Sequence, residues 1–259
     1  MRIGRFEYDG RVFYGKIEGS EVTVVDGDIF GDYRLSAEAY HIDGLRILTP
    51  VEPPNIICVG LNYKSHAAES RMEPPERPVI FFKLTTAAAP HNAIISLPRP
   101  APDEVDYEAE LCAIIGRKAK DVEESDALKY VFGYTCGNDV SARDCQFKLD
   151  QQWARAKSFD GFCPIGPWIE TELDPADVRV EGLLNGTVTQ SSTTARMIFS
   201  AAQLVSYCSK NFTLLPGTVI MTGTPEGVGY ARKPPIYLNS GDVFEVRISG
   251  VGSLVNTFT

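Results

Sequence analysis

The 259-residue sequence has no apolar run of roughly 18 residues, the length that a membrane-spanning helix needs. Its first stretch, MRIGRFEYDGRVFYGK, alternates apolar and polar residues and contains no signal-peptide core. The six cysteines are scattered without a Cys-x-x-Cys pair, so reduced and mostly buried thiols are expected instead of a disulfide framework. We therefore expect a cytoplasmic protein that does not act on a membrane.

Positive charge is scarce as well: 25 Lys and Arg residues stand against 34 Asp and Glu residues, a net charge of −9. This balance argues against nucleic-acid partners, and an acidic substrate would need local cations or a metal ion at its site. The sequence also lacks a Gly-x-Ser-x-Gly nucleophile elbow and a His-Glu-x-x-His zinc motif. Its glycine-rich stretch TGTPEGVG does not end in the Gly-Lys-Ser/Thr of a nucleotide-binding loop. Serine hydrolases, zinc proteases and P-loop enzymes are thus disfavoured.

Short β-strands separated by turn residues dominate what is present. Residues 1–52 predict a small β-rich N-terminal module, which a proline-rich stretch joins to a main domain over residues 53–259. In the main domain, Asn185-Gly186 is typical of a tight hairpin turn, and residues 195–210 carry the longest helical pattern. Because strands dominate and helices are short, we predict a mixed α+β, β-rich fold and not a doubly wound α/β sheet.

The stretch DYEAEL is the most informative local pattern. If it is extended, Asp106, Glu108 and Glu110 lie on one face, because side chains alternate sides along a strand. A solvated outer face would explain this pattern equally well, but the strand continues as the apolar CAIIG, which places the carboxylates beside a buried core. Asp139 follows another apolar strand and precedes Ser141, a candidate helix cap; alone, Asp139 would be a turn residue. Carboxylates at this spacing suit Mg²⁺, Mn²⁺ or Ca²⁺ and not zinc.

His66 and Glu69 lie three residues apart in a segment with helical character, so their side chains are neighbours on one helical face. A carboxylate beside an imidazole orients the ring and raises its basicity, which suits the activation of water. A surface His–Glu pair is the ordinary explanation, but neither of the other two histidines has a glutamate at this spacing. Gly60 before the segment and prolines after it would let the segment move as a lid.

Together these segments resemble the fumarylacetoacetate hydrolase family over residues 53–259. The matching stretches occur in the order and spacing of the family: IICVGLNYKSHAAE, PVIFFK, DYEAELCAIIG, GYTCGNDVSARDCQ, WARAKSFDGFCPIGPW, ARMIFS and MTGTPEGVG. The resemblance implies a β-roll of mixed sheets with short helices, usually assembled as a homodimer. It also implies a bound divalent metal ion, Mg²⁺ or Mn²⁺, with Ca²⁺ as a further option.

The resemblance assigns roles to individual residues. The positions that match the metal-binding carboxylates are Glu108, Glu110 and Asp139. The positions that match the catalytic groups are His66 and Glu69, the water-activating pair on a mobile lid, and Lys157, the lysine beside the substrate. The positions that match substrate contacts are Arg143, Gln146, Thr224 and, less closely, Lys83. From composition alone, Lys157, Arg143, Gln146 and Lys83 would be ordinary solvated residues.

The chain resembles the shorter, three-carboxylate branch of the family, because Asn62 stands where longer members place an extra carboxylate. That branch includes acylpyruvases, oxaloacetate decarboxylases and 2-hydroxyhepta-2,4-diene-1,7-dioate isomerases, so the implied substrate is a small 2-oxo or β-diketo acid that reacts through a metal-chelated enolate. The intact His66–Glu69 pair favours hydrolysis of a C–C bond in an acylpyruvate-like substrate, since hydrolysis needs an activated water. A metal-binding protein without catalysis is the alternative of another class; His66, Glu69 and Lys157 together argue against it.

Overall fold

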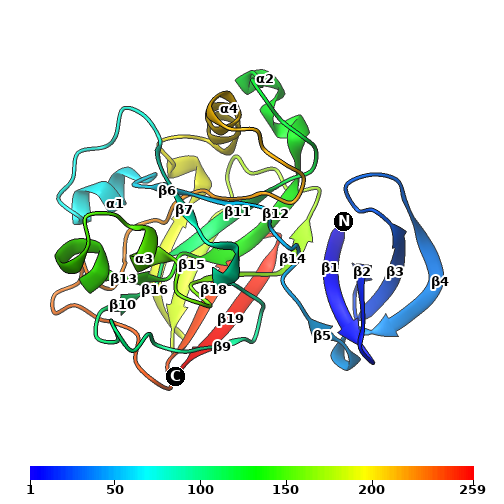
Figure 1. Cartoon of the computed structure of the whole chain (residues 1–259), viewed down its shortest axis with the longest axis horizontal. Helices are drawn as coiled ribbons and strands as arrows, with labels where there is room; N and C mark the ends of the chain where they lie inside the picture. Colours follow the sequence, from blue (N-terminus) through cyan, green and yellow to red (C-terminus); the bar gives the residue numbers. More distant parts are fainter.

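The computed structural model describes all residues, 1–259. The chain begins with an antiparallel meander in which each strand pairs with the next: β1 (Arg2–Tyr8), β2 (Arg11–Glu18), β3 (Glu21–Gly27) and β4 (Tyr33–His41). The two-residue strand β5 (Arg46–Ile47) pairs with β1. Buried apolar side chains, Phe6 and Val22 among them, form a small core of the meander. Figure 1 shows these strands beside the larger body of the chain.

Strand pairing joins the meander to the main body, because β1 also pairs with β14 (Cys163–Glu170). From β14 the sheet continues in the order β12, β11, β17, β6 and β7, with β17 and β6 parallel to each other and the other neighbours antiparallel. Its further strands are β6 (Ile56–Gly60), β7 (Val79–Lys83), β8 (Ala88–Ala89), β11 (Ala109–Ile115), β12 (Val131–Asn138) and β17 (Val219–Met221). Every residue of β11 is buried, so the end of this strand lies deep in the molecule.

A second sheet has the strand order β16, β15, β18, β19 and β9. The strands of this sheet are β9 (Ile94–Ile95), β15 (Arg179–Leu184), β16 (Thr187–Thr193), β18 (Val243–Ile248) and β19 (Gly252–Phe258). A separate two-stranded sheet pairs β10 (Val105–Asp106) with β13 (Ser141–Ala142). The largest core, 33 buried residues, draws on both large sheets, for example Leu111 of β11 and Val246 of β18. The predicted β-rich mixed fold is confirmed. So is the hairpin at Asn185-Gly186, where φ is 50° and 78°, as a tight hairpin turn requires.

The helices are short: α1 (Lys64–Glu69), α2 (Glu124–Ala127), α3 (Ala154–Lys157) and α4 (Ala201–Asn211), with a π-helical turn at Cys145–Leu149. No helix has the length and apolar character that crossing a membrane requires. The helix predicted over 195–210 begins later, because Ser200 and Gln203 cap its start reciprocally. Ser141 is not a helix cap; it lies in β13, and Asp144 caps the π-helical turn instead. All six cysteines are free and buried, as predicted.

We expect Ser200→Ala to lower the free energy of unfolding by about 1 kcal/mol, the usual contribution of a helix N-cap. The hydroxyl oxygen of Ser200 accepts a hydrogen bond from the backbone N–H of Gln203, which would otherwise lack a partner in the first turn of α4. Urea unfolding followed by circular dichroism measures the change. Ser191→Ala, on the exposed side of β16, is the matched control. An S200A protein no less stable than S191A would contradict this role of the cap.

Candidate active site

The three predicted metal ligands meet where β11 and β12 run side by side. Glu110 lies in β11 opposite Gly137 of β12. Glu108 precedes β11, and its carbonyl oxygen accepts a hydrogen bond of 2.9 Å from the backbone N–H of Asp139, just beyond β12. One carboxylate oxygen from each of Glu108, Glu110 and Asp139 lies within 4.8 Å of the others, and all three residues are buried. Three hard oxygen donors at this separation could hold a divalent cation.

Asp106 does not belong to this cluster. The sequence predicted that Asp106, Glu108 and Glu110 share one strand face, but the extended stretch is interrupted between β10 and β11. The carboxylate of Asp106 is completely buried and accepts hydrogen bonds from Arg143 Nε at 2.9 Å and from the backbone N–H groups of Gly229 and Tyr230 at 2.7 and 3.0 Å. Arg143 contacts both Asp106 and Glu108, but Asp106 adds no oxygen to the cluster formed by Glu108, Glu110 and Asp139.

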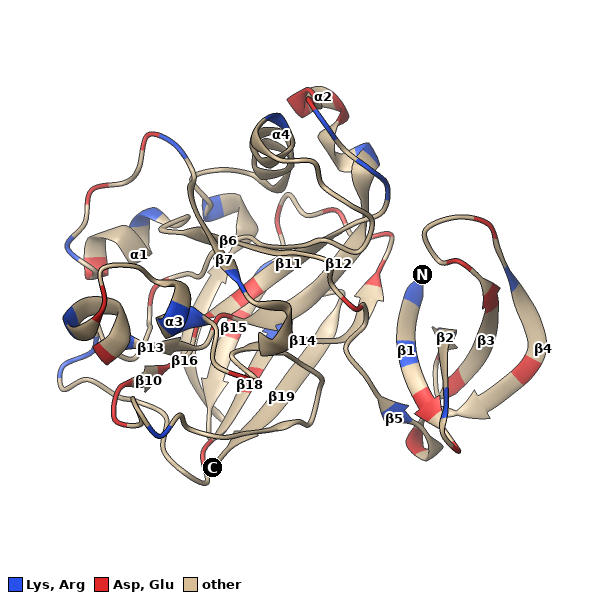
Figure 2. Cartoon of the chain, viewed as in Figure 1, with Lys and Arg blue, Asp and Glu red and all other residues tan.

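Buried cations surround the cluster. Lys157 Nζ lies 3.0 Å from Glu108 Oε2 and 2.9 Å from Asp139 Oδ2, and Arg143 Nη2 lies 2.5 Å from Glu108 Oε1. Burial opposes ionisation of Glu108, but Lys157 and Arg143 outweigh it and hold the pKa of this carboxyl well below its ordinary value. Burial and the neighbouring charges of Asp139 and Glu108 raise the pKa of Glu110 well above its ordinary value. Figure 2 shows an acidic position on β11 and basic positions on α3.

The charges and unsatisfied atoms of the cluster fit a metal ion. With all carboxylates ionised, as metal ligands are, the buried side chains around the cluster carry four negative and three positive charges: Asp106, Glu108, Glu110 and Asp139 against Lys83, Arg143 and Lys157. Oδ1 of Asp139 lies 2.7 Å from Lys83 Nζ but accepts no hydrogen bond, because this ammonium group already donates to three carbonyl oxygens. An unsatisfied buried oxygen is costly. A divalent cation would coordinate such an oxygen and leave one net positive charge, which suits an anionic substrate.

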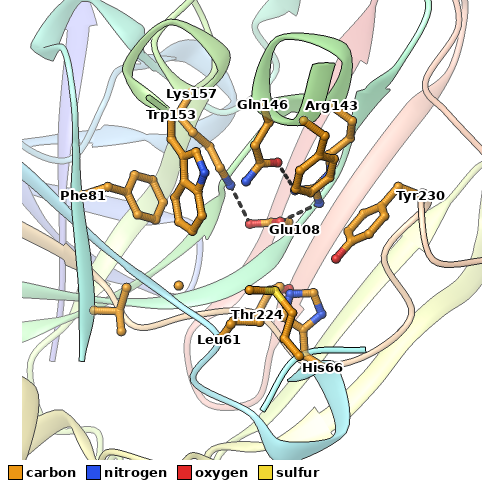
Figure 3. A pocket seen from close by; sticks show the side chains of 14 residues that line it. Leu61, His66, Phe81, Glu108, Arg143, Gln146, Trp153, Lys157, Thr224 and Tyr230 are labelled. Atoms are coloured by element: carbon orange, nitrogen blue, oxygen red, sulfur yellow. Dashed lines mark hydrogen bonds and ion pairs between the residues drawn. The ribbon is translucent and has the colours of Figure 1, made fainter. Parts of the chain in front are cut away.

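Six of the residues that the sequence predicted line one cavity (Figure 3): His66, Glu108, Arg143, Gln146, Lys157 and Thr224. Arg143 Nη1 donates a hydrogen bond of 2.7 Å to Gln146 Oε1, which orients both side chains. Lys157 and Arg143 are buried, so the solvated positions that composition alone suggested are wrong. Lys83 is not among the residues that line the cavity. Its ammonium group lies 2.7 Å from Asp139 Oδ1, in a position to support that carboxylate.

His66 and Glu69 lie on α1, and His66 is opposite Gln146 and Lys157 in the cavity wall (Figure 3). Nδ1 of His66 is 2.7 Å from Glu69 Oε1, and Glu69 Oε2 accepts a hydrogen bond of 2.9 Å from the backbone N–H of Gly227. If the proton on Nδ1 faces this carboxylate, Nε2 remains as the free basic nitrogen. The pair that the sequence placed on one helical face is thus within hydrogen-bond distance and beside the cavity.

The sequence patterns gave no indication of the aromatic walls of the cavity. Phe81 and Trp153 form one side and Tyr230 another (Figure 3). Phe81 and Trp153 pack edge to face with ring centroids 5.4 Å apart. Lys157 Nζ lies 5.1 Å from the centroid of Phe81, and the guanidinium carbon of Arg143 lies 4.4 Å from that of Tyr230. Aromatic faces stabilise such cations and exclude water around them. Phe81 and Trp153 lie in matched motifs, but nothing in the sequence pattern distinguishes Tyr230.

Thr224 is held in place by a residue that the sequence did not suggest. Its hydroxyl donates to the carbonyl oxygen of Ala109 at 3.0 Å and accepts from Gln190 Nε2 at 2.8 Å. The same Gln190 side chain accepts a hydrogen bond of 2.9 Å from the backbone N–H of Ala109, so it links β16 to the start of β11. Asn62, which stands where longer members of the family place a carboxylate, lies on the loop before α1. It is buried, and its side chain forms hydrogen bonds only with backbone groups. Its role in this structure is to hold that loop.

Comparisons with known proteins identify the family of the chain. The fumarylacetoacetate hydrolase C-terminal family model matches residues 55–259, and an Rv2993c-like N-terminal model matches residues 1–50. The chain is 51% identical to the fumarylacetoacetate hydrolase domain-containing protein 2 homolog of Dictyostelium discoideum, over 83% of this chain and 74% of that protein. It is 42% identical to the mitochondrial oxaloacetate tautomerase Fahd2a of Rattus norvegicus, over 81% of this chain and 68% of that protein.

A solved structure is similar along the whole chain. The 5-carboxymethyl-2-hydroxymuconate delta-isomerase from Mycobacterium smegmatis is 42% identical, with a TM-score of 0.91, and the match covers 100% of this chain and 99% of that one. The family model, the sequence relatives and the solved structure all lead to one assignment: the chain belongs to the fumarylacetoacetate hydrolase family.

Proposed function

We propose that the chain is a divalent-metal-dependent enzyme that transfers a proton on the enol form of a small 2-oxo acid, interconverting tautomers or double-bond isomers. The observation that carries this proposal is a cavity with two chemically distinct walls. Glu108 of the carboxylate cluster lies in one wall with Lys157 and Arg143, and His66, hydrogen-bonded to Glu69, lies in the other. A relative named for oxaloacetate tautomerisation and a structure named for a hydroxymuconate isomerase support the same class of reaction. Oxaloacetate is therefore the first substrate to test.

The wall around the cluster would bind the carboxylate and 2-oxo end of the substrate. Glu108, Glu110 and Asp139 would hold the cation, and three protein oxygens suit Mg²⁺ or Mn²⁺, which keep positions for water and substrate. A bound cation would stabilise negative charge on the 2-oxo oxygen. Lys157 and Arg143 would attract the substrate carboxylates, and their buried positions strengthen this attraction because little water screens it.

The opposite wall would move the proton. With Nδ1 of His66 held by Glu69, Nε2 would accept the proton of the 2-hydroxyl group of the enol and deliver it to C3 of the same substrate. The O–H bond breaks, a C–H bond forms at C3, and the enol becomes the ketone without loss of any atom. Glu69 would stabilise the imidazolium that exists between the two transfers.

Hydrolysis of a C–C bond in an acylpyruvate-like substrate, which the sequence favoured, is the second candidate. The same free Nε2 of His66 supports it, because this nitrogen could deprotonate a water molecule instead of the enol. Decarboxylation of oxaloacetate needs mainly an electron sink at the 2-oxo oxygen and gives the His66–Glu69 pair no task. A protein that only binds metal would likewise leave a His–Glu pair beside the cavity without a task.

Three reactions measured side by side test the proposal. With Mn²⁺ present, kcat/KM is determined for loss of the enol absorbance of oxaloacetate, for cleavage of acetylpyruvate and for release of pyruvate from oxaloacetate. Each value is corrected for Mn²⁺ without protein. We expect the first reaction to have the highest kcat/KM. A higher value for acetylpyruvate would replace the proposal with hydrolysis, and a higher value for pyruvate release would replace it with decarboxylation. No turnover of any substrate by metal-loaded protein would refute an enzymatic role on 2-oxo acids of this size.

A further inference from the structure

A turn formed by residues 226–230 is hydrogen-bonded to α1 along the length of the helix. Three hydrogen bonds join the two segments: Ser65 Oγ to Glu226, the backbone N–H of Gly227 to Glu69 Oε2 at 2.9 Å, and the Tyr230 hydroxyl to Ser70 Oγ. They are distributed from the first turn of α1 to the residue that follows its last turn. The 226–230 turn therefore determines where α1 places His66.

The carboxylate of Asp106 anchors this turn through hydrogen bonds. Its Oδ1 accepts a hydrogen bond from the backbone N–H of Gly229, and its Oδ2 accepts from the backbone N–H of Tyr230 and from Arg143 Nε. The approach is so close that a Cβ atom at Gly229 would lie 2.5 Å from Asp106 Oδ1 and 1.9 Å from the backbone oxygen of Ile236. The ring of Tyr230 in turn covers the guanidinium group of Arg143. One buried carboxylate thus fixes both Arg143 and the 226–230 turn.

The helix α1 needs support from outside itself. It has six residues, and an isolated helix of this length is not stable in water. Its N-cap, Tyr63, provides no side-chain hydrogen bond. Leu61 and Arg71, just before and after α1, have φ values of 54° and 56°, a left-handed conformation that is unfavourable for residues other than glycine. Local sequence therefore does not hold α1 over the cavity. Tertiary contacts do so: Asn62 fixes the loop before α1, and the 226–230 turn bonds the helix itself.

We propose that Asp106 is the positioning residue that couples Arg143 to His66. The same carboxylate that orients the guanidinium group holds, through the 226–230 turn, the helix that carries His66. Asp106 neither lines the cavity nor belongs to the cluster of candidate metal ligands. The inference relies on the proposed function in treating Arg143 and His66 as parts of one site, but the coupling itself can be measured without any substrate.

Asp106→Asn tests the coupling, because the amide keeps the shape of the side chain but removes its charge. Its NH₂ group would also face a hydrogen-bond donor, Arg143 or the backbone of the 226–230 turn, in place of a carboxylate oxygen. We expect deuterium exchange of the amides of residues 64–72 to accelerate about tenfold or more, since α1 loses its anchored support. With the substrate found for the wild-type protein, kcat should fall about 10- to 100-fold, the effect of losing hydrogen bonds to a charged group. Asp103→Asn, three residues away and exposed, is the matched control.

Tyr230→Phe provides a milder test, because it removes the hydroxyl that reaches Ser70 and keeps the ring on Arg143. Exchange of residues 64–72 should accelerate about three- to tenfold. Both substitutions act through the 226–230 turn. In the double variant, the amides of residues 64–72 should therefore exchange more slowly than the product of the two single accelerations would give. Unchanged exchange in α1, an equal increase along the whole chain, or fully independent effects would overturn the inference. A wild-type protein without turnover would refute the proposed function but leave the exchange result valid.

Discussion

Mn²⁺ is expected to raise the melting temperature of the wild-type protein, and replacing Glu110 with Gln is expected to abolish this increase together with any metal-dependent activity. The amide would keep the shape of the Glu110 side chain but remove one of three negative charges from a cluster whose oxygens lie within 4.8 Å of one another. A ligand at 100 times its dissociation constant stabilises the folded protein by about 2.7 kcal/mol if it binds only that state. Melting curves with Mn²⁺ and with EDTA measure the difference, and the control is Glu21→Gln, at the exposed first residue of β3.

The metal-free proteins give an independent check on this prediction. Because Glu110 lies buried among carboxylates, its replacement by a neutral side chain relieves repulsion, and the E110Q protein in EDTA should melt at or above the temperature of the wild type. A large decrease in EDTA would mean that Glu110 stabilises the fold in another way. Isothermal titration that gives the same Mn²⁺ affinity in wild type and E110Q would show that the cation binds elsewhere.

His66→Ala is expected to lower kcat by about 10²- to 10⁴-fold, the usual contribution of a general acid or base. The imidazole lies in the cavity wall, hydrogen-bonded to Glu69 and outside the cluster of candidate metal ligands. Binding of Mn²⁺ and of oxalate, which resembles the carboxylate and 2-oxo end of the substrate, should therefore survive. Calorimetry and steady-state kinetics separate the two effects.

The matched control is His41→Ala, whose side chain is 63% exposed at the end of β4, far along the chain from the cavity. This variant should retain wild-type kcat. Loss of Mn²⁺ binding in H66A would instead make His66 a metal ligand or a structural residue, and proton transfer by this side chain would have to be abandoned.

Local patterns predicted the fold class and most strands, and they failed where the chain departs from regular geometry. The helical pattern over 195–210 was correct only after Ser200, because a side-chain cap fixed the start of α4 inside the periodic stretch. Asp106 has the right spacing for a third carboxylate on one face, but in the structure it accepts hydrogen bonds from Arg143, Gly229 and Tyr230 and does not join the cluster. Periodicity describes a continuous element, and it contains no information about where the element is interrupted.

The candidate site depended more on resemblance than on pattern. Nothing in the local sequence marks Lys157 as buried, since a lysine is buried only where distant carboxylates, here those of Glu108 and Asp139, surround it. Gln190 and Tyr230 reach the site from segments far along the chain, and their hydrogen bonds form only in the folded molecule. Single-sequence reasoning identifies residue types and spacings, whereas these contacts are properties of the tertiary structure.

The six buried cysteines can report local opening of the structure through the rate at which their thiols are labelled. Burial raises the pKa of the Cys163 and Cys208 thiols to about 12, so almost no thiolate exists in the closed structure. Alkylating reagents attack the thiolate and need access to it. Each cysteine should therefore be labelled only when its surroundings open. Cys58 on β6, Cys163 on β14 and Cys208 on α4 would then give labelling rates for three parts of the molecule without an introduced probe.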